Sequence, residues 1–239
     1  HTDTVSCVCF GAHDDTLAST SATEAACTVR LWDLHSQTSQ ARHPGHSGFV
    51  WSVTASPAGD TLVTGGSDRT VRVWDVATAA PVQVLTGHTG EVYGCAFSPD
   101  GRLLASGSDD NTVRVWGKSG GEWGGLHTCR GHSDMVNDVC FSGDGHLMAS
   151  ASDDNTVRVW RVGSWDCVHT LGLGGCVASV AFAPGAPRGA PLLAAATSSS
   201  VKVWNVAAER CVGEKDCTTA VINALCYSPD GSLLALGNR

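Results

Sequence analysis

The sequence lacks long apolar runs and any excess of positive charge. No stretch approaches the roughly 18 consecutive apolar residues that a membrane-spanning helix needs, and the first residues do not combine a basic and an apolar segment as a secretion signal does. Charged residues make up only 16% of the 239, and the formal net charge is −8. Nucleic acid and anionic membrane surfaces are therefore disfavoured as partners, because binding to either usually requires a basic surface.

Motifs that bind metals, cofactors or phosphate groups are also missing. The 11 cysteines include no Cys-x-x-Cys pair, and without a secretion signal we expect them to be reduced thiols of an intracellular protein. Neither His-Glu-x-x-His nor a phosphate-binding Gly-x-x-x-x-Gly-Lys run occurs. The sequence therefore predicts no metal, no cofactor and no catalytic residues.

What the sequence has instead is an internal repeat. The heptapeptide Asp110–Trp116, DNTVRVW, returns unchanged at Asp154–Trp160. Tryptophans recur at intervals of 42 or 44 residues, at Trp32, Trp74, Trp116, Trp160 and Trp204. Three of them follow a Gly-His pair, each with its His 28 residues before the Trp. A period of this length is typical of proteins in which each repeat is one supersecondary unit.

Within each repeat, short runs rich in β-branched residues alternate with turn residues. The segments 98–101 and 228–231 both contain Ser-Pro-Asp-Gly, which favours a tight turn because Pro presets φ and Gly accepts positive φ. No segment has the 3.6-residue apolar period of a long helix. The sequence therefore predicts an all-β fold with about four strands per repeat.

The segments from Gly87-His88 to Trp116 and from Gly131-His132 to Trp160 resemble WD repeats, and the resemblance covers nearly the whole chain. It implies a β-propeller of four-stranded antiparallel blades, with five full repeats and half of a sixth visible, as part of a seven-bladed ring. The expected repeat units of this single propeller domain are about 1–44, 45–86, 87–130, 131–171, 172–216 and 217–239.

The ring is expected to be incomplete with these residues alone. We expect this chain to be the visible portion of a longer protein, because an unclosed ring leaves strand edges unpaired. An alternative is an open six-bladed ring completed by a partner's strands, as in the coat and nuclear-pore propellers that such a chain resembles.

The resemblance also implies a hydrogen-bonded set in each regular blade, made of a His, a Ser or Thr, an Asp and a Trp. The three complete sets contain His46, Asp68 and Trp74; His88, Asp110 and Trp116; and His132, Asp154 and Trp160. The hydroxyl members are Thr64, Ser106 and Ser150, with Ser108 and Ser152 left open as alternatives. A His beside an Asp also suggests catalysis, but recurrence of the pair in three blades favours a structural role.

The repeats depart from this pattern in the other blades. Ala26 replaces the turn Asp in the first, Leu173 and Ser198 replace His and Asp in the fifth, and Thr218 replaces His in the sixth. We therefore expect blades two to four to be the rigid part, and the others to depend more on packing or on partners.

Five aromatic residues lie outside the repeat pattern. Phe49, Trp51 and Tyr93 come three or five residues after a repeat His, where the family pattern places the top of the ring. Met135 shares the Phe49 position, and turns on the same face carry Arg69, Asn111 and Asn155. These seven residues are the candidate partner-binding face, because aromatic and Met side chains are enriched in binding hot spots. The alternative is that the rings only fill space between blades. Trp123 and Trp165 are expected near outer strands.

The function that the resemblance implies is a non-catalytic protein-interaction scaffold within a larger intracellular assembly. Alternatives are a substrate receptor or adaptor of a ubiquitin ligase, a peptide or chromatin reader and, last, a propeller enzyme. The first of these is weakened because Trp32-Asp33-Leu34-His35 lacks the Arg of the Trp-Asp-x-Arg motif that such receptors often carry. We expect a cytoplasmic or cytoskeletal location, with cilium and nucleus as alternatives, and no secretion.

Overall fold

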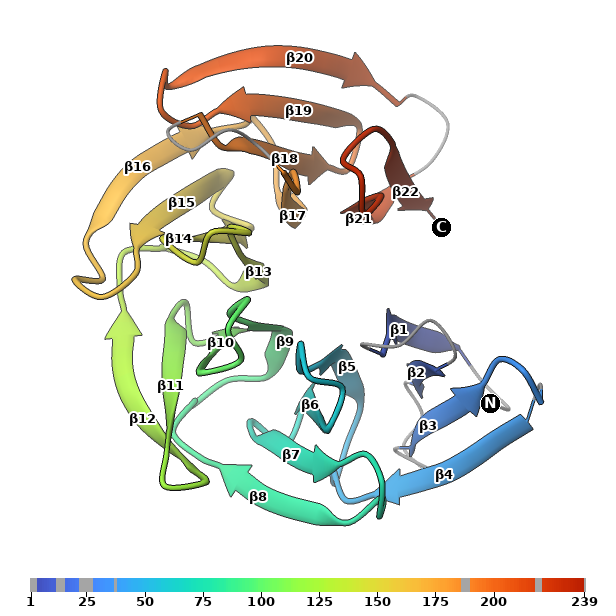
Figure 1. The fold of residues 1–239 in the computed structure, drawn as a ribbon. Coiled ribbons are helices and arrows are strands. Elements are labelled where there is room, and N and C mark those ends of the chain that lie inside the picture. Colours follow the sequence, from blue (N-terminus) through green and yellow to red (C-terminus); the bar gives the residue numbers. More distant parts are fainter. Residues whose placement is uncertain are drawn as a thin grey trace. The chain divides into compact units, whose positions relative to one another are not determined.

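A computed structural model of the chain describes residues 4–11, 16–21, 28–36, 38–185, 190–217 and 221–238, and every regular element in these ranges is a β-strand (Figure 1). The expectation of an all-β fold is confirmed. The described strands form five four-stranded antiparallel sheets and one two-stranded sheet, and in each the chain runs to and fro between neighbouring strands.

The first three sheets are β1–β4, β5–β8 and β9–β12. Their strands are β1 (Val5–Phe10), β2 (Thr16–Ser21), β3 (Thr28–Asp33), β4 (Thr38–Pro44), β5 (Val50–Ala55), β6 (Thr61–Gly66), β7 (Val71–Asp75), β8 (Pro81–Leu85), β9 (Val92–Phe97), β10 (Leu103–Ser108), β11 (Val113–Ser119) and β12 (Glu122–Cys129).

The other three sheets are β13–β16, β17–β20 and the pair β21–β22. Their strands are β13 (Val136–Phe141), β14 (Leu147–Ser152), β15 (Thr156–Arg161), β16 (Cys167–Gly172), β17 (Val177–Phe182), β18 (Leu192–Thr197), β19 (Ser200–Asn205), β20 (Arg210–Asp216), β21 (Ile222–Tyr227) and β22 (Leu234–Asn238).

The chain divides into two compact units. The first consists of His1–Asp110 and Arg114–Thr128, and the second of Asn111–Val113 and Cys129–Arg239. In the first unit β5 packs against both β1 and β9, and in the second β17 packs against both β13 and β21. Sheets that stand side by side on their first strands are the blades of a β-propeller, so the predicted fold class is confirmed. Ring completion and the single domain stay predictions.

The second strands of the second and fifth blades are covered on both sides. In β6 and β18, whose neighbouring blades lie in the same unit, every residue after the first is buried. Side chains of successive strand residues point to opposite faces of a sheet, so both faces of these strands must be covered by neighbouring blades. The outermost strands differ: all seven residues of β20 are exposed.

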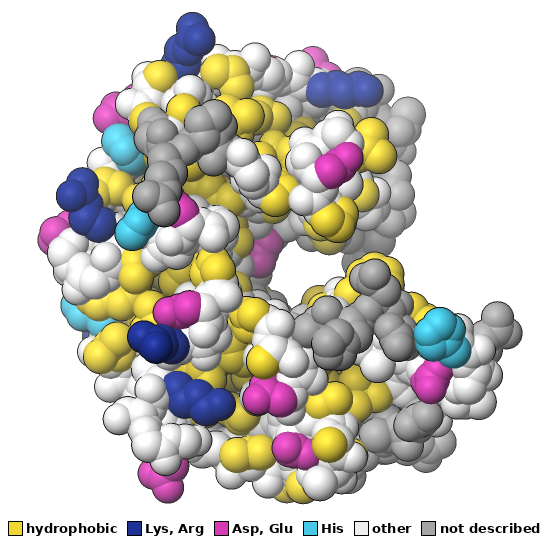
Figure 2. All heavy atoms as spheres, in the orientation of Figure 1, with side chains coloured by type: hydrophobic (Ala, Val, Ile, Leu, Met, Phe, Trp, Pro, Cys, Tyr) yellow, Lys and Arg dark blue, Asp and Glu magenta, His cyan; other side chains and the backbone are white. Residues whose placement is uncertain are grey.

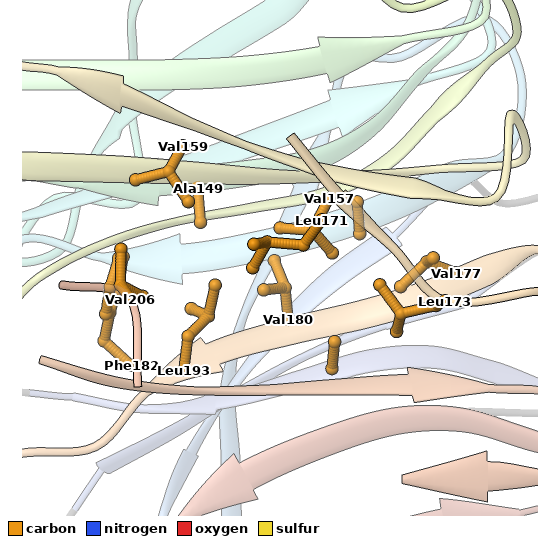
Figure 3. Packing of buried hydrophobic residues seen from close by; sticks show 12 residues of the cluster. Ala149, Val157, Val159, Leu171, Leu173, Val177, Val180, Phe182, Leu193 and Val206 are labelled. Carbon is orange, nitrogen blue, oxygen red and sulfur yellow. The ribbon is translucent and has the colours of Figure 1, made fainter. Parts of the chain in front are cut away.

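Apolar side chains fill the space between neighbouring blades. Between the fourth and fifth blades, Val157, Val159 and Leu171 pack with Val180 and Leu193 (Figure 3). The fourth and fifth blades therefore share one core.

The first strand of the first blade exposes apolar side chains that other blades bury. Val5 and Val8 are 47% and 56% exposed, whereas Val50 and Val53, at the same repeat positions in β5, are 0% and 3% exposed. Val50 and Val53 are buried because the first blade packs against β5. No described segment covers Val5 and Val8 of β1 in the same way. The exposed face of β1 is therefore apolar, like the face of β5 that the first blade covers.

The glycine of the Gly-His pair lies beside the third strand of its own blade. Gly87 has a φ of +148°, and a Cβ at this position would lie 2.7 Å from an Nη1 atom of Arg114. Gly131 repeats the arrangement against Arg158, again at 2.7 Å. The recurrent Arg of the third strand therefore packs over backbone that only glycine can supply.

We predict that Gly87→Ala lowers the free energy of unfolding by about 1–3 kcal/mol, because Ala would be strained at this φ and would collide with Arg114. The matched control is Gly124→Ala in β12, where an added Cβ meets nothing within 4 Å. Urea unfolding of both variants measures the difference. Equal stability of the two variants would contradict the assignment.

Candidate functional site

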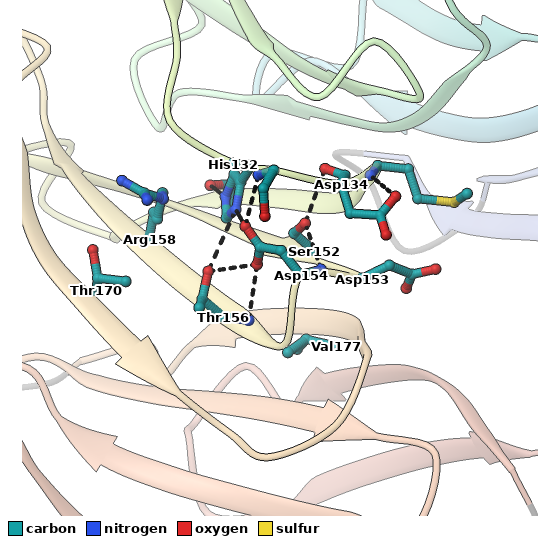
Figure 4. Close-up of polar contacts among 12 residues, drawn as sticks. His132, Asp134, Ser152, Asp153, Asp154, Thr156, Arg158, Thr170 and Val177 are labelled. Atoms are coloured by element: carbon teal, nitrogen blue, oxygen red, sulfur yellow. Dashed lines mark hydrogen bonds and ion pairs between the residues drawn. The ribbon is translucent and has the colours of Figure 1, made fainter.

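A continuous series of hydrogen bonds runs through the fourth blade. Asp154 accepts a hydrogen bond from His132 Nδ1 at 2.8 Å (Figure 4). His132 Nε2 lies 2.7 Å from Ser150 Oγ. The indole nitrogen of Trp160 donates to the same Ser150 oxygen at 2.9 Å. Thr156 Oγ1 donates to Asp154 at 2.6 Å. Residues from both ends of the blade are therefore joined through one buried hydroxyl.

The second and third blades repeat this geometry. The Nδ1–carboxylate distance is 2.8 Å for both His46 and His88, and their Nε2 atoms lie 2.7 and 2.8 Å from the hydroxyls of Thr64 and Ser106. Each hydroxyl also accepts the indole N–H of its blade's Trp, Trp74 or Trp116, at 3.0 Å. The structure thus brings together all nine predicted residues of the three sets.

The two alternative hydroxyls have another role. Ser108 Oγ accepts the backbone N–H of Asp110, and Ser152 Oγ accepts that of Asp154, both at 3.1 Å. They hold the turn that carries the Asp, while Ser106 and Ser150 lie inside the set.

The directions of the hydrogen bonds in each set follow from which groups can donate and which can accept. Because the carboxylate takes Nδ1–H, Nε2 accepts from the hydroxyl, and the hydroxyl accepts from the indole. Burial raises the pKa of Asp68, but hydrogen bonds from His46 and Thr70 outweigh it and hold the pKa well below its usual value. Burial lowers the pKa of His132, against the opposite influence of Asp154. The stability contributed by Asp68 is therefore present at neutral pH and lost in strong acid.

In the third and fourth blades the order Asp, His, Ser is that of a hydrolytic triad, but the hydroxyl is inaccessible. Ser106 and Ser150 are 0% exposed, and each already accepts a Trp N–H. A nucleophile must meet its substrate within bonding distance, so this arrangement can hold a blade together and cannot attack a bound substrate.

We expected the sequence to contain no Gly-x-Ser-x-Gly pattern, the motif that carries the nucleophile of many hydrolases, and this expectation is wrong. Residues 117–121 have this pattern around Ser119. They form the end of β11 and the turn before β12, with Ser119 exposed, whereas a nucleophile elbow lies between a strand and a helix.

The first and fifth blades keep less of the set. In the first, Trp32 donates to Ser19 Oγ at 2.7 Å, while Ala26 lies outside the described residues, as does Thr218 of the sixth blade. In the fifth, Leu173 is buried in the core and Ser198 is exposed. The hydroxyl position is Ala195, and the buried Trp204 Nε1 has no hydrogen-bond partner in the described part of the chain.

The sequence-based predictions did not include the replacement of the hydroxyl residue by Ala195 in the fifth blade. Its signal was present in the repeat, because Ala195 lies nine residues before its Trp where Ser150 lies ten before, with one residue fewer in the connecting turn. Pairing in the sheet shows the equivalence: Ser150 faces Arg158 and Ala195 faces Lys202, the shared basic position of the third strand.

The three unassigned aromatic residues of the second and third blades form a row. Ring centroids of Phe49 and Trp51 are 5.3 Å apart, and those of Trp51 and Tyr93 are 5.7 Å apart. All three residues are half-buried, so they fill space between the blades and also reach the surface. The indole N–H of Trp51 donates to Glu91 Oε2 at 2.7 Å. We call Phe49, Trp51, Tyr93 and Glu91 the aromatic row.

Glu91 was not foreseen, although the repeat contained the signal. It follows His88 by three residues, the position of Phe49 after His46 and of Met135 after His132. Of these three positions, only that of Glu91 places a carboxylate against the rings.

The remaining predicted residues lie in turns or beside them. Arg69, Asn111 and Asn155 occupy equivalent turn positions with φ of 65°, 64° and 68°; Arg69 and Asn155 are exposed, and Asn111 is half-buried. Asn adopts this conformation readily and Arg does not. Met135 is half-buried, and its carbonyl accepts the N–H of Asp153 at 3.1 Å. Met135, Asn111 and Asn155 belong to the second unit, and Arg69 to the first.

Trp123 is a core residue. It is buried, its ring packs against Phe97 at 5.8 Å, and Gln83 of the neighbouring blade bonds both backbone groups of Trp123 at 2.7 and 2.8 Å. Trp165 is half-buried with a φ of 63°, in the turn before β16.

A second set of hydrogen bonds joins the first strands of the second unit. Asp138 Oδ2 accepts from Ser179 Oγ (2.7 Å) and from the N–H of Val180 (3.0 Å), both in β17. Ser179 Oγ in turn accepts the N–H of Leu225 in β21 at 3.2 Å. Hydrogen bonds that begin at the Asp138 carboxylate thus join β13 to β17 and β17 to β21.

Burial raises the pKa of Asp138 to about 6, although bonds from Ser179 and Val180 act in the opposite direction. The ionised form is therefore disfavoured in the folded protein. This contact could have been predicted from the repeat, because Asp138 and Ser52 each lie six residues after the His of their repeat. Ser52 likewise accepts a backbone N–H of the next blade, that of Cys95, at 3.1 Å.

No group of three His, Cys, Asp or Glu side chains that could hold a metal ion is found within the described ranges. In the same ranges no helix is long and apolar enough to cross a membrane.

We predict that Trp160→Phe destabilises the protein more than Trp204→Phe, by about 1–2 kcal/mol. Only the first change removes a hydrogen bond and leaves Ser150 without its donor, while both remove similar ring volume. The free energies of unfolding of the two variants measure the difference. Equal losses would show that the set adds nothing beyond packing.

We predict a changed pH dependence for Asp138→Asn. Because the folded pKa of Asp138 lies above its unfolded value, its contribution is fully favourable below about pH 4 and is lost as the pH rises through about 6. Between pH 7 and 5 the wild type should gain about 1–3 kcal/mol relative to the variant. Urea unfolding at both pH values measures this, and parallel behaviour of the two proteins would refute it.

The chain matches the family model of the WD domain, G-beta repeat, over residues 1–33, 37–75, 79–117 and 124–161. Most matched segments begin near the outer strand of one blade and end at the third strand of the next, as 37–75 does with β4 and β7. A search of curated proteins found no match. The four segments cover more than half of the chain, and the sheets they form are propeller blades, so the chain belongs to the WD-repeat family.

Proposed function

We propose that this protein is a non-catalytic scaffold subunit that binds other proteins in a larger intracellular assembly. The aromatic row carries the proposal. Half-buried rings that reach the surface beside a carboxylate have the composition of a binding hot spot, which combines aromatic anchors with a polar rim. WD-repeat domains generally bind proteins, and family members are mostly non-catalytic, which supports the same conclusion.

The packing of the blades favours a rigid platform. The first strands of the second and third blades are held by the Ser52–Cys95 bond and by Trp51, which reaches across to Glu91. A binding face on a rigid framework loses little conformational entropy when a partner docks. This supports the aromatic row as a preformed contact surface.

Two further parts of the proposal concern assembly and location. The exposed apolar face of β1, with Val5, Val8 and Phe10, has the chemistry to pack against another blade-like sheet, either of a longer chain or of a partner. An intracellular location, cytoplasmic or cytoskeletal, is supported by the free thiols of the described cysteines, because such thiols persist in a reducing compartment.

We predict that the double variant Phe49→Ser/Tyr93→Ser loses its partners. Removing two hot-spot rings typically costs at least about 2 kcal/mol of binding free energy. Affinity purification of the tagged full-length protein, with crosslinking to map contacts, compares the variant with wild type.

The matched control is Val82→Ser/Val84→Ser, which removes two exposed apolar side chains from the outer strand β8. It should retain the partners. If the protein is recovered alone, or if both double variants lose the same partners, the proposed scaffold role of the aromatic row fails.

A further inference from the structure

The rings of the aromatic row present their faces in a form suited to a cation. Neighbouring rings are tilted by 49° between Phe49 and Trp51 and by 53° between Trp51 and Tyr93, and none of the three residues is buried. The face of an aromatic ring carries negative electrostatic potential, and a cation above it is attracted.

Two acidic residues lie at the Trp51–Tyr93 end of the row, one with its carboxylate bonded to Trp51 and the other with its backbone bonded to the first. Trp51 occupies Oε2 of Glu91, and among the described contacts Oε1 has no hydrogen-bond partner. The N–H of Asp109 donates to the backbone oxygen of Glu91 at 2.9 Å, which places the exposed Asp109 next to it. No Lys or Arg forms an ion pair with either residue in the described part of the chain.

The surroundings favour one end of the row. Phe49 accepts a hydrogen bond from the N–H of Ser67 at 2.8 Å, which holds the turn with the exposed Arg69 beside Phe49. A cation would be repelled there and attracted at the other end, where Glu91 and Asp109 lie. Acidic side chains are also spread over the face drawn in Figure 2, in keeping with the net charge of −8.

We propose that the Trp51–Tyr93 end of the aromatic row binds an arginine side chain in an exposed segment of a partner protein. The guanidinium stacks on the rings and donates to the carboxylate of Glu91. This inference rests on the proposed scaffold function and names the chemistry of the partner.

Arginine fits this site better than other side chains. A guanidinium is planar, stacks on aromatic faces and donates parallel N–H bonds to a carboxylate, which the compact ammonium of lysine cannot do. An apolar side chain would bury Glu91 Oε1 without a partner, at a cost. A phosphate would be repelled by both carboxylates.

The test uses a short fluorescein-labelled peptide of alternating glycine and arginine, with binding followed by fluorescence anisotropy. Matched peptides contain lysine or citrulline in place of arginine, and citrulline keeps the shape without the charge. Binding should be strongest for arginine and about tenfold weaker or more for citrulline.

Variants assign the binding to the site. Glu91→Gln keeps an oxygen for the Trp51 N–H and removes the charge, and it should weaken arginine-peptide binding about fivefold to tenfold. Tyr93→Ser should have a similar effect. Glu122→Gln, at an exposed position in the outer strand β12, changes the net charge equally and should leave binding unchanged. Thermal melts check that each variant is folded.

Several outcomes would overturn the inference: equal binding of arginine and citrulline peptides, no binding of the arginine peptide, or equal weakening by Glu91→Gln and Glu122→Gln. Failure here is distinguishable from failure of the scaffold function. If partner capture is lost in Phe49→Ser/Tyr93→Ser but retained in Glu91→Gln, the scaffold function stands and the arginine site does not.

Discussion

Mutual burial of neighbouring sheets is the constraint on which the rest of this structure depends. The second strands of the second and fifth blades bury both of their faces, so an isolated blade would leave two apolar surfaces in water. The sequence repeat reinforces this arrangement, because a matched segment such as 37–75 combines the outer strand of one blade with three strands of the next. The first and second blades are therefore joined by the covalent chain as well as by a shared core.

The buried polar sets show two solutions to one packing problem. In the second, third and fourth blades, His, Asp, hydroxyl and Trp satisfy one another, which removes the penalty of burying polar groups. The fifth blade replaces the His by Leu173, which joins the core between the fourth and fifth blades, and the hydroxyl by Ala195. The imidazole position tolerates an apolar residue because neighbouring blades cover it, and the remaining cost is the unsatisfied Trp204 N–H.

Rigid blades leave the segments between them available for recognition. The aromatic row lies at the starts of β5 and β9, so its rings are held by strands that are themselves buried. Trp51 belongs to both functions, since its N–H bonds Glu91 across the blades while part of its ring remains exposed. Trp51 can thus stabilise the packing of the second blade against the third and also form part of the binding surface.

The sequence by itself determined the repeat, the strands and most members of the polar sets, because these depend on residues of one blade separated by a constant spacing. It did not determine whether Ser106 or Ser108 bonds His88, because alternation places both side chains on the same side of β10. The strand pairing, with a register shift between Gly107 and Ser108, places Ser106 at His88. Contacts between blades were decided only by the tertiary structure. Trp51 and Glu91 are 40 residues apart, and which side chains meet at that separation depends on how two sheets pack, which periodicity within one repeat does not specify.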